Sequence, residues 1–210
     1  MATNILHWES MYEKPLQEIP WEISEPPKEL IEVIENREVK LCKVLDFGCG
    51  TGNYSIYLAK LGFSVTGIDC SKNALSIAKK NAKNSGVKIK FVLCDILEIC
   101  ETVKEKFDFV LDYSLLHHLP LEQTKNHAES SCKLLNKNGK VLLVCYSEKD
   151  EDAKEKNSNV GKYGNLMYYR TANEIRAAYS RAGFKELYYK EVRLGKRLHH
   201  AAYCFMFQKI

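Results

Sequence analysis

The chain has 210 residues, of which 45% are hydrophobic and 28% are charged, and its formal net charge is +4. This length fits one domain with a full core, so residues 1–210 are expected to form a single domain. The charge is mild and mixed in sign along the chain. It lacks the strong basic footprint of a nucleic-acid groove, which argues against a nucleic-acid partner.

Two further features of the composition concern location and metals. No apolar run is long enough to cross a membrane, and the amino terminus lacks the charged-then-apolar pattern of a secretion signal. We therefore expect a cytoplasmic protein with no membrane partner. The eight cysteines are scattered and form no Cys-x-x-Cys pair, so neither a zinc site nor a disulfide is expected, and no metal ligands are predicted.

Apolar strand-like runs alternate with segments of helical periodicity along most of the chain. Strands are expected at residues 44–47, 64–68, 88–94, 107–112, 140–145, 184–193 and 200–208. Helices are expected at 51–61, from Ser71 to Gly86, at 121–135 and at 171–181, with a turn at 136–139. This alternation is typical of an α/β fold whose parallel sheet is covered by helices on both faces.

Two segments fall outside the alternation. Residues 1–28 carry both tryptophans and four prolines, and residues 147–170 form a long connection that is charged at first and then rich in Gly and Tyr. Long connections without regular structure are usually functional. Ligands of open α/β sheets bind beyond the carboxyl ends of the strands, so we predict an amino-terminal lid and a substrate-side loop, respectively.

A glycine-rich turn is the most informative motif. Residues 44–53 read VLDFGCGTGN, so glycines stand at 48, 50 and 52 between an expected strand and an expected helix. Glycine lets the backbone approach a ligand closely, and the following helix directs N–H groups at it. The dinucleotide fingerprint needs its third glycine one position later, where Asn53 stands. This spacing argues against a nicotinamide oxidoreductase.

Four of the expected strands are followed by, or end in, a carboxylate: Asp46, Asp69, Asp95 and Asp112. Any one of them alone could be a turn residue or a helix cap. Asp69 lies about twenty residues beyond the glycine turn, where an acid accepts the hydroxyls of a ribose. Asp95 is placed to accept from an adenine amino group. Asp46 would repel a phosphate but suits a cationic group, which predicts a nucleoside ligand without phosphate.

These motifs resemble those of the class I S-adenosylmethionine (SAM) methyltransferases. Residues 44–53 look like motif I of that family, 68–69 like motif II, 94–96 like motif III and 107–112 like motif IV. The resemblance implies an α/β, Rossmann-like three-layer sandwich. Its seven-stranded, mostly parallel sheet would have the strand order 3-2-1-4-5-7-6, with strand seven antiparallel.

The same resemblance implies SAM as the cofactor, S-adenosylhomocysteine as its product, and no metal. The reaction would be an in-line displacement of the methyl group by a small-molecule nucleophile. The residues expected to bind the cofactor are Asp46, Gly48, Cys49, Gly50, Gly52, Asp69, Cys70, Asp95, Ile96, Asp112 and Trp21.

The amino-terminal pattern of Trp8, Tyr12 and Pro20-Trp21 is similar to that of the thiopurine/tellurite-resistance branch of the family. This implies an acceptor such as a thiol or a chalcogenide. That branch often has Asp-Arg-Gly where this chain has Asp112-Tyr113-Ser114, and the missing arginine argues against an anionic thiopurine-like acceptor. The residues expected to contact the acceptor are Trp8, Tyr12, Tyr113 and Tyr163.

His117 and His118 follow the fourth expected strand at the mouth of the predicted site. A histidine there can act as general base on a hydroxyl or amine acceptor, because its unperturbed pKa lies near neutrality. The alternative is a histidine hydrogen-bonded to backbone with no catalytic role. A thiolate acceptor would need no base.

Other functions stay open at this stage. Cofactor motifs report binding and not turnover, so a catalytically silent SAM-binding module that regulates or scaffolds a partner is one alternative. A protein or RNA methyltransferase is another, although the Asn-Pro-Pro-Tyr tetrad of enzymes that methylate nucleic-acid amino groups is absent. The sequence leaves the acceptor undetermined and does not distinguish a monomer from a homodimer.

Overall fold

The computed structural model describes residues 4–153, 158–161, 164–195 and 200–210. Its large sheet has seven strands, which are β1 (Lys43–Phe47), β2 (Ser64–Asp69), β3 (Lys90–Leu93), β4 (Phe107–Tyr113), β5 (Leu135–Tyr146), β8 (Phe184–Leu194) and β9 (His200–Lys209). Its α-helices are α1 (Ile5–Met11), α2 (Lys28–Glu35), α3 (Asn53–Lys60), α4 (Lys72–Asn84), α5 (Ile99–Thr102), α6 (Gln123–Leu134) and α7 (Ala172–Arg181). Short 3-10 helices are η1 (Leu16–Glu18), η2 (Ile96–Glu98) and η3 (Leu116–His118).

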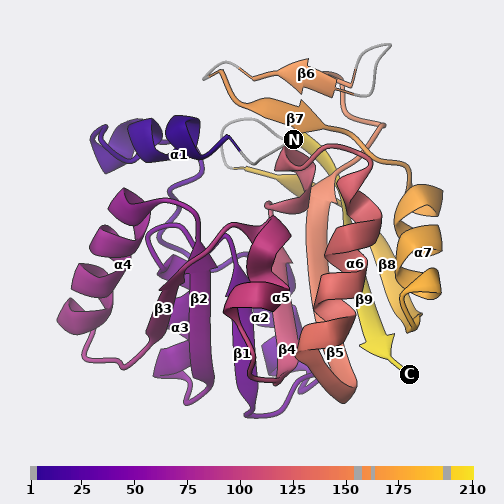
Figure 1. Ribbon diagram of the computed structural model, residues 1–210, viewed down its shortest axis with the longest axis horizontal. Coiled ribbons are helices and arrows are strands. Elements are labelled where there is room, and N and C mark those ends of the chain that lie inside the picture. Colours follow the sequence, from indigo (N-terminus) through magenta and orange to yellow (C-terminus); the bar gives the residue numbers. More distant parts are fainter. Residues whose placement is uncertain (1–3, 154–157, 162–163, 196–199) are drawn as a thin grey trace.

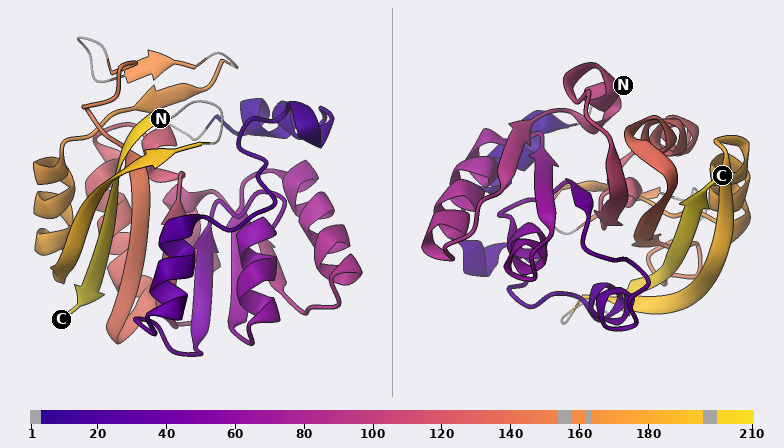
Figure 2. Two further views of the ribbon diagram at one scale, coloured as in Figure 1. Left: turned by 180° about the vertical axis from the view of Figure 1, so that it is seen from behind. Right: turned by 90° about the horizontal axis from the view of Figure 1, so that it is seen from below.

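The strand order is β3-β2-β1-β4-β5-β9-β8, and β9 runs antiparallel to both of its neighbours. Numbered within this sheet alone, the order is 3-2-1-4-5-7-6, so the expected fold is confirmed. Helices α2 and α3 cover one face, and α5, α6 and α7 cover the other (Figures 1 and 2). Helix α4 packs beside the edge strand β3.

The core explains why the strands are nearly continuous apolar runs. Successive strand residues point to opposite faces of a sheet, and both faces of this sheet are covered by helices. Val44 therefore packs in the cluster under α2 and α3, whereas its neighbour Leu45 packs in the cluster under α6 and α7. The two side chains are both fully buried, as expected for a parallel strand covered on both sides.

Residues 147–170 differ from the expected loop without regular structure. They contain an antiparallel hairpin of β6 (Ser158–Val160) and β7 (Leu166–Tyr168), which forms a second, two-stranded sheet. Both views place this hairpin and α1 at the same end of the molecule, beyond the carboxyl ends of β1 and β4 (Figures 1 and 2). The three-residue strands are too short to give a clear period-2 pattern, which is why the sequence did not reveal them.

The prediction of a turn at residues 136–139 is also wrong in detail, because these residues belong to the start of a strand. Strand β5 begins at Leu135, which pairs with Phe107 before the register shifts. The side chain of Asn136 donates to Asp108 Oδ1 over 2.7 Å, and Asn138 adopts a φ of 64°. These contacts hold the segment against β4 as an irregular start of the strand.

Within the part of the chain that the structure describes, no helix has the length and apolar character needed to span a bilayer.

Candidate functional site

A cavity of about 660 Å³ lies at the carboxyl ends of the parallel strands, between the amino-terminal segment and the β6–β7 hairpin. This size is within the range typical of small-ligand sites. Most residues predicted from the sequence line it: Trp8, Tyr12, Trp21, Asp46, Gly48, Cys49, Gly50, Asp69, Cys70, Ile96, Tyr113, His117 and His118. Tyr163, predicted to contact the acceptor, lies outside the described residues.

The glycine turn has the backbone geometry that its sequence predicts. Gly48 and Gly50 have φ values of 64° and 53°, in the left-handed region that side chains disfavour. A Cβ atom at Gly50 would come within 2.8 Å of the Tyr12 hydroxyl. The turn therefore brings backbone to the cavity wall and leaves room there for the amino-terminal segment.

Asp69 is fixed at the end of β2 by backbone amides. Its Oδ2 accepts from Gly50 N over 2.9 Å, and its Oδ1 accepts from Ser71 N over 2.9 Å. Burial raises the pKa of this carboxyl, and the bonds from the amides oppose that rise. Asp69 thus couples the glycine turn to β2 while it still lines the cavity.

Asp46 is the most perturbed acid of the cavity. It is only 3% exposed, and its Oδ2 accepts a 2.6 Å hydrogen bond from Ser55 Oγ. Burial raises its pKa to about 7, and the charges of Asp112 and Asp69 add to this rise. A buried carboxyl without a cationic partner is energetically costly in its charged form. The site would therefore gain from a cationic ligand group.

Glu22 was missed by the sequence analysis. It lies in the amino-terminal segment and accepts from Thr51 Oγ1 over 2.6 Å and from Asn53 Nδ2 over 3.2 Å. Burial raises the pKa of this carboxyl. The sequence carried no motif for Glu22, since its partners lie about thirty positions away. Its contacts attach the amino-terminal segment to the glycine turn.

The aromatic residues of the amino-terminal segment form one contact chain over the cavity. Trp21 Nε1 donates to the Tyr12 hydroxyl over 3.0 Å, and the ring centroids of Trp8 and Trp21 lie 5.4 Å apart. Trp8 also lies edge-on to His118, with centroids 4.6 Å apart. Tyr12, which was predicted to contact the acceptor, therefore lies beside the glycine turn, and Trp8 reaches His118.

The two histidines present different groups to the cavity. His118 Nδ1 lies 3.2 Å from the carbonyl oxygen of Leu166, which can only accept, so this nitrogen carries the proton. His117 Nδ1 accepts from Tyr146 N over 3.3 Å, so its proton is on Nε2. Burial lowers the pKa of His118 to about 4 and that of His117 well below its usual range. At neutral pH, Nε2 of His118 is therefore an acceptor and Nε2 of His117 a donor.

Three residues predicted to bind the cofactor do not line the cavity. Asp112 is fully buried behind it, with Oδ1 accepting from Leu115 N over 2.9 Å and Oδ2 lying 2.7 Å from His127 Nε2. Asp95 Oδ1 accepts from Leu97 N and caps η2. Gly52 begins α3, where a Cβ atom would lie 3.2 Å from Ala78 Cβ. These three residues therefore have structural contacts in the fold, and their contact with a cofactor stays a prediction.

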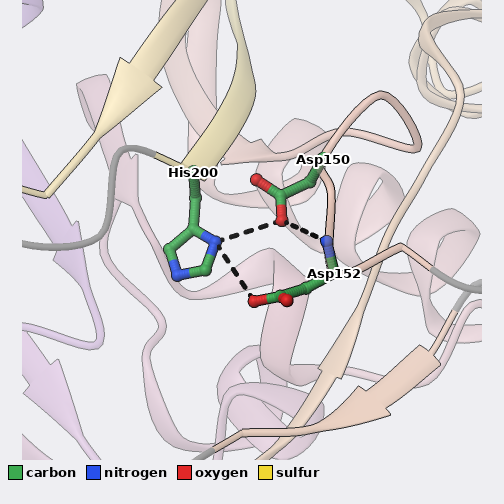
Figure 3. Close-up of side chains that lie close together, drawn as sticks. All are labelled: Asp150, Asp152 and His200. Carbon is green, nitrogen blue, oxygen red and sulfur yellow. Dashed lines mark hydrogen bonds and ion pairs between the residues drawn. The ribbon is translucent and has the colours of Figure 1, made fainter.

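The far side of the cavity contains residues that the sequence analysis did not select. Tyr146, at the end of β5, stacks on His117 with centroids 3.8 Å apart and lies 4.6 Å from His200. Asp152 and His200 also line this side, and Asp150 joins them in the cluster of Figure 3. Their positions in the sequence could have revealed them. Tyr146, Asp150 and Asp152 lie at or just beyond the carboxyl end of the fifth strand, and His200 begins the last strand.

Acidic residues, and no Lys or Arg among the described residues, line the cavity. These acidic residues are Glu22, Asp46, Asp69 and Asp152. A phosphate-bearing ligand would be repelled by this wall, whereas a cationic ligand would be attracted.

Comparison with known proteins identifies relatives of this chain. A family model described as "Methyltransferase domain" matches residues 38–193. A 2-heptyl-1-hydroxyquinolin-4(1H)-one methyltransferase of Mycobacteroides abscessus is 31% identical over 130 residues, which are 61% of this chain and 56% of that protein. The match thus spans only about half the length of that curated relative.

Solved structures share the fold over nearly the whole chain. One, from work on the conversion of a disulfide bond into a thioacetal group during echinomycin biosynthesis, has a TM-score of 0.80 at 22% identity, covering 99% of this chain and 91% of that one. Another is the Burkholderia thailandensis 1,6-didemethyltoxoflavin-N1-methyltransferase, solved with bound 1,6-didemethyltoxoflavin and S-adenosylhomocysteine. It has a TM-score of 0.75 at 19% identity and covers 98% of this chain and 87% of that one.

Proposed function

Because the chain belongs to the methyltransferase-domain family and has the class I SAM-methyltransferase fold, we propose that it transfers the methyl group of SAM to a small-molecule nucleophile. The observation that carries this proposal is the pairing of the glycine turn with two cavity carboxylates, Asp46 and Asp69, in a wall without Lys or Arg among the described residues. SAM is a nucleoside without phosphate that bears two cationic groups, so it fits this wall.

The residues present suit the parts of SAM. Asp69 is held by backbone amides at the end of β2, where its remaining lone pairs can accept from the ribose hydroxyls. Asp46 is buried and has no cationic partner among the described residues, so it would hold the methionyl ammonium. Ile96, beyond β3, would pack on the adenine. Asp95, which caps η2, remains the candidate partner of the adenine amino group.

Bound SAM would supply an already activated methyl group, so the protein has to align the acceptor and exclude water. The amino-terminal aromatics Trp8 and Trp21 would cover the site and present π faces to the sulfonium. His118 Nε2 would accept a hydrogen bond from an acceptor hydroxyl or amine and orient it. Its pKa of about 4 means that it would pass the proton on to solvent rather than keep it.

A cavity of about 660 Å³ at the carboxyl ends of the strands supports a small-molecule acceptor over a protein or an RNA. The cavity lies beneath α1 and the β6–β7 hairpin, and Figure 1 shows both at this end of the sheet. A thiol or chalcogenide acceptor, as in the thiopurine/tellurite-resistance branch, and an oxygen or nitrogen acceptor remain candidates within this class. The cytoplasm is the compartment we propose, with all eight cysteines as free thiols.

Calorimetry and a transfer assay test the proposal together. We expect SAM and S-adenosylhomocysteine to bind at micromolar Kd and NAD not to bind. Radiolabelled SAM should then methylate at least one member of a panel of thiols, selenite, phenols and amines. Binding without any transfer would favour a silent SAM-binding module, and an absence of SAM binding would overturn both.

A further inference from the structure

A strained turn precedes η3, the short helix that carries the two histidines of the cavity. Ser114 lines the cavity and has a φ of 77°, in the left-handed region that residues with a side chain rarely adopt. Such a conformation is unfavourable by itself and persists only where neighbouring contacts hold it. The turn at Ser114 directs the residues that follow, so the contacts that hold it also decide where His117 and His118 lie.

Asp112, two residues before this turn residue, supplies two of those contacts. Its Oδ1 accepts from Leu115 N over 2.9 Å and from Leu116 N over 3.3 Å. The same segment packs on the glycine turn, where a Cβ atom at Gly48 would lie only 2.6 Å from Leu115 Cδ1. Asp112 therefore fixes the segment that joins the proposed cofactor wall to the two histidines.

The other oxygen of Asp112 faces His127, which lies in α6. Asp112 Oδ2 and His127 Nε2 are 2.7 Å apart, and both side chains are entirely buried. The N–H bond of the ring is not directed at this oxygen, so the two groups are in close contact without an aligned hydrogen bond. His127 Nδ1 lies 3.1 Å from the hydroxyl of Tyr179 in α7. The carboxylate that holds η3 is thus backed by a histidine from one helix, which a tyrosine from the next helix contacts.

Stability alone does not explain a polar pair at this position. The ring of Phe47 lies edge-on to His127 with centroids 5.5 Å apart, and Phe47 and Ala128 belong to the apolar cluster under α6 and α7. Well-packed apolar residues often stabilise such a core as well as a buried ion pair does. A buried carboxylate, however, needs a partner that offsets the cost of its burial, and Asp112 is bound to the backbone of η3. The pair therefore serves the placement of η3.

We propose that His127, acting through Asp112, positions η3 and so decides which ring nitrogens His117 and His118 present to the acceptor. This inference rests on the proposed function, which places the acceptor beside these two histidines. His127 does not line the cavity, so it is a positioning residue that neither binds the acceptor nor takes its proton. Tyr179, in contact with the second ring nitrogen of His127, limits the rotation of that ring.

The contacts of the two cavity histidines make this placement measurable. His117 Nδ1 accepts from Tyr146 N, and His118 Nδ1 lies beside the carbonyl oxygen of Leu166. These contacts give the two rings opposite tautomers, with the proton on Nε2 of His117 and on Nδ1 of His118. If η3 moves, both contacts are lost, and each neutral ring then interconverts between its two tautomers.

Long-range proton–nitrogen NMR correlation spectra of isotope-labelled histidines show which ring nitrogen carries the proton. In the native complex with S-adenosylhomocysteine at pH 7, we expect opposite tautomers for His117 and His118. His127→Leu should convert both rings to mixtures of tautomers. His127→Gln should restore the native tautomers, because its side-chain amide can replace Nε2 beside Asp112. Leu134→Ala, a buried apolar change in the same helix, is the matched control for a loosened core and should leave both tautomers unchanged.

Unchanged tautomers in folded His127→Leu would overturn the inference. Equal changes in His127→Leu and Leu134→Ala, or the absence of any rescue in His127→Gln, would overturn it as well, because the effect would then be a general loosening of the core. If His127→Leu does not fold, Tyr179→Phe replaces it, since this change removes the hydroxyl and keeps the ring that stacks on Phe207.

Tyr179→Phe should shift the same two histidine signals in the same direction, and an unchanged spectrum would then overturn the inference. The proposed function and this inference fail separately. If S-adenosylhomocysteine does not bind, the proposed function fails, and the spectra of the ligand-free protein still show whether His127 sets the tautomers of the two rings.

Discussion

Replacement of Asp46 by Asn should stabilise the ligand-free protein while weakening its binding of SAM. The native carboxyl is 3% exposed, and its pKa rises from 3.8 to about 7 because burial disfavours its charged form. A rise of about three pKa units corresponds to about 4 kcal/mol of unfavourable free energy once the group is ionised. The Asn amide is neutral and can still accept from Ser55 Oγ.

The sign of the pH dependence follows from proton linkage. Native Asp46 holds its proton up to about pH 7, whereas the unfolded chain loses it near pH 4. Its contribution to the free energy of unfolding is therefore fully present below pH 4 and is lost as the pH rises through 7. Relative to Asp46→Asn, the native protein should become less stable across this window, with most of the change between pH 5 and 7.

Urea unfolding at pH 5, 6, 7 and 8 measures this difference. The exposed Glu101, changed to Gln, serves as a control that removes a carboxyl without removing a buried one. Equal stability of Asp46→Asn and the native protein at every pH, or a difference that does not change with pH, would show that Asp46 does not titrate with a raised pKa in the folded protein. The same variant should bind SAM at least tenfold more weakly, because it lacks the charge that pairs with the ammonium.

Three further changes test other parts of the site. Asp69→Ala should weaken SAM binding at least tenfold in calorimetry, and an unchanged Kd would remove Asp69 from the ribose contact. His118→Ala should slow methylation of hydroxyl acceptors at least tenfold in a radiolabel assay and spare thiols; equal losses for both would contradict the orienting role. Arg170→Met should lower the free energy of unfolding by about 3 kcal/mol, since the carbonyls of Leu119 and Pro120 lose their buried donor. A decrease in the free energy of unfolding of less than about 1 kcal/mol, measured by urea denaturation, would contradict this.

The sequence predicted the sheet well because its signals are local. The central parallel strands β1 and β4 are apolar runs covered on both faces. Some helices begin at a readable cap, such as Ser71 before α4 and the capping box of Thr171 and Glu174 before α7. The glycine turn was equally readable, since the positive φ of Gly48 and Gly50 depends on residue type. These features indicate one wall of the cavity, at residues 46 to 70, which is the proposed cofactor side.

The side of the cavity near His200 could not be predicted from the sequence, because it depends on contacts between residues distant in sequence. Asp150 and His200 are fifty positions apart and meet only because β9 inserts beside β5. Asp112 matched a motif yet pairs with His127 in the core, since residue type and spacing do not tell which face of a strand end a side chain takes. The β6–β7 hairpin escaped detection because its strands have three residues each.

A crystal structure of the complex with S-adenosylhomocysteine would show whether the proposed residues bind the cofactor. We expect the ribose hydroxyls at Asp69, the amino group at Asp46, and the sulfur directed toward His117 and His118. A ligand in the opposite orientation, with its adenosine beside His200, or a ligand bound outside this cavity, would contradict this expectation.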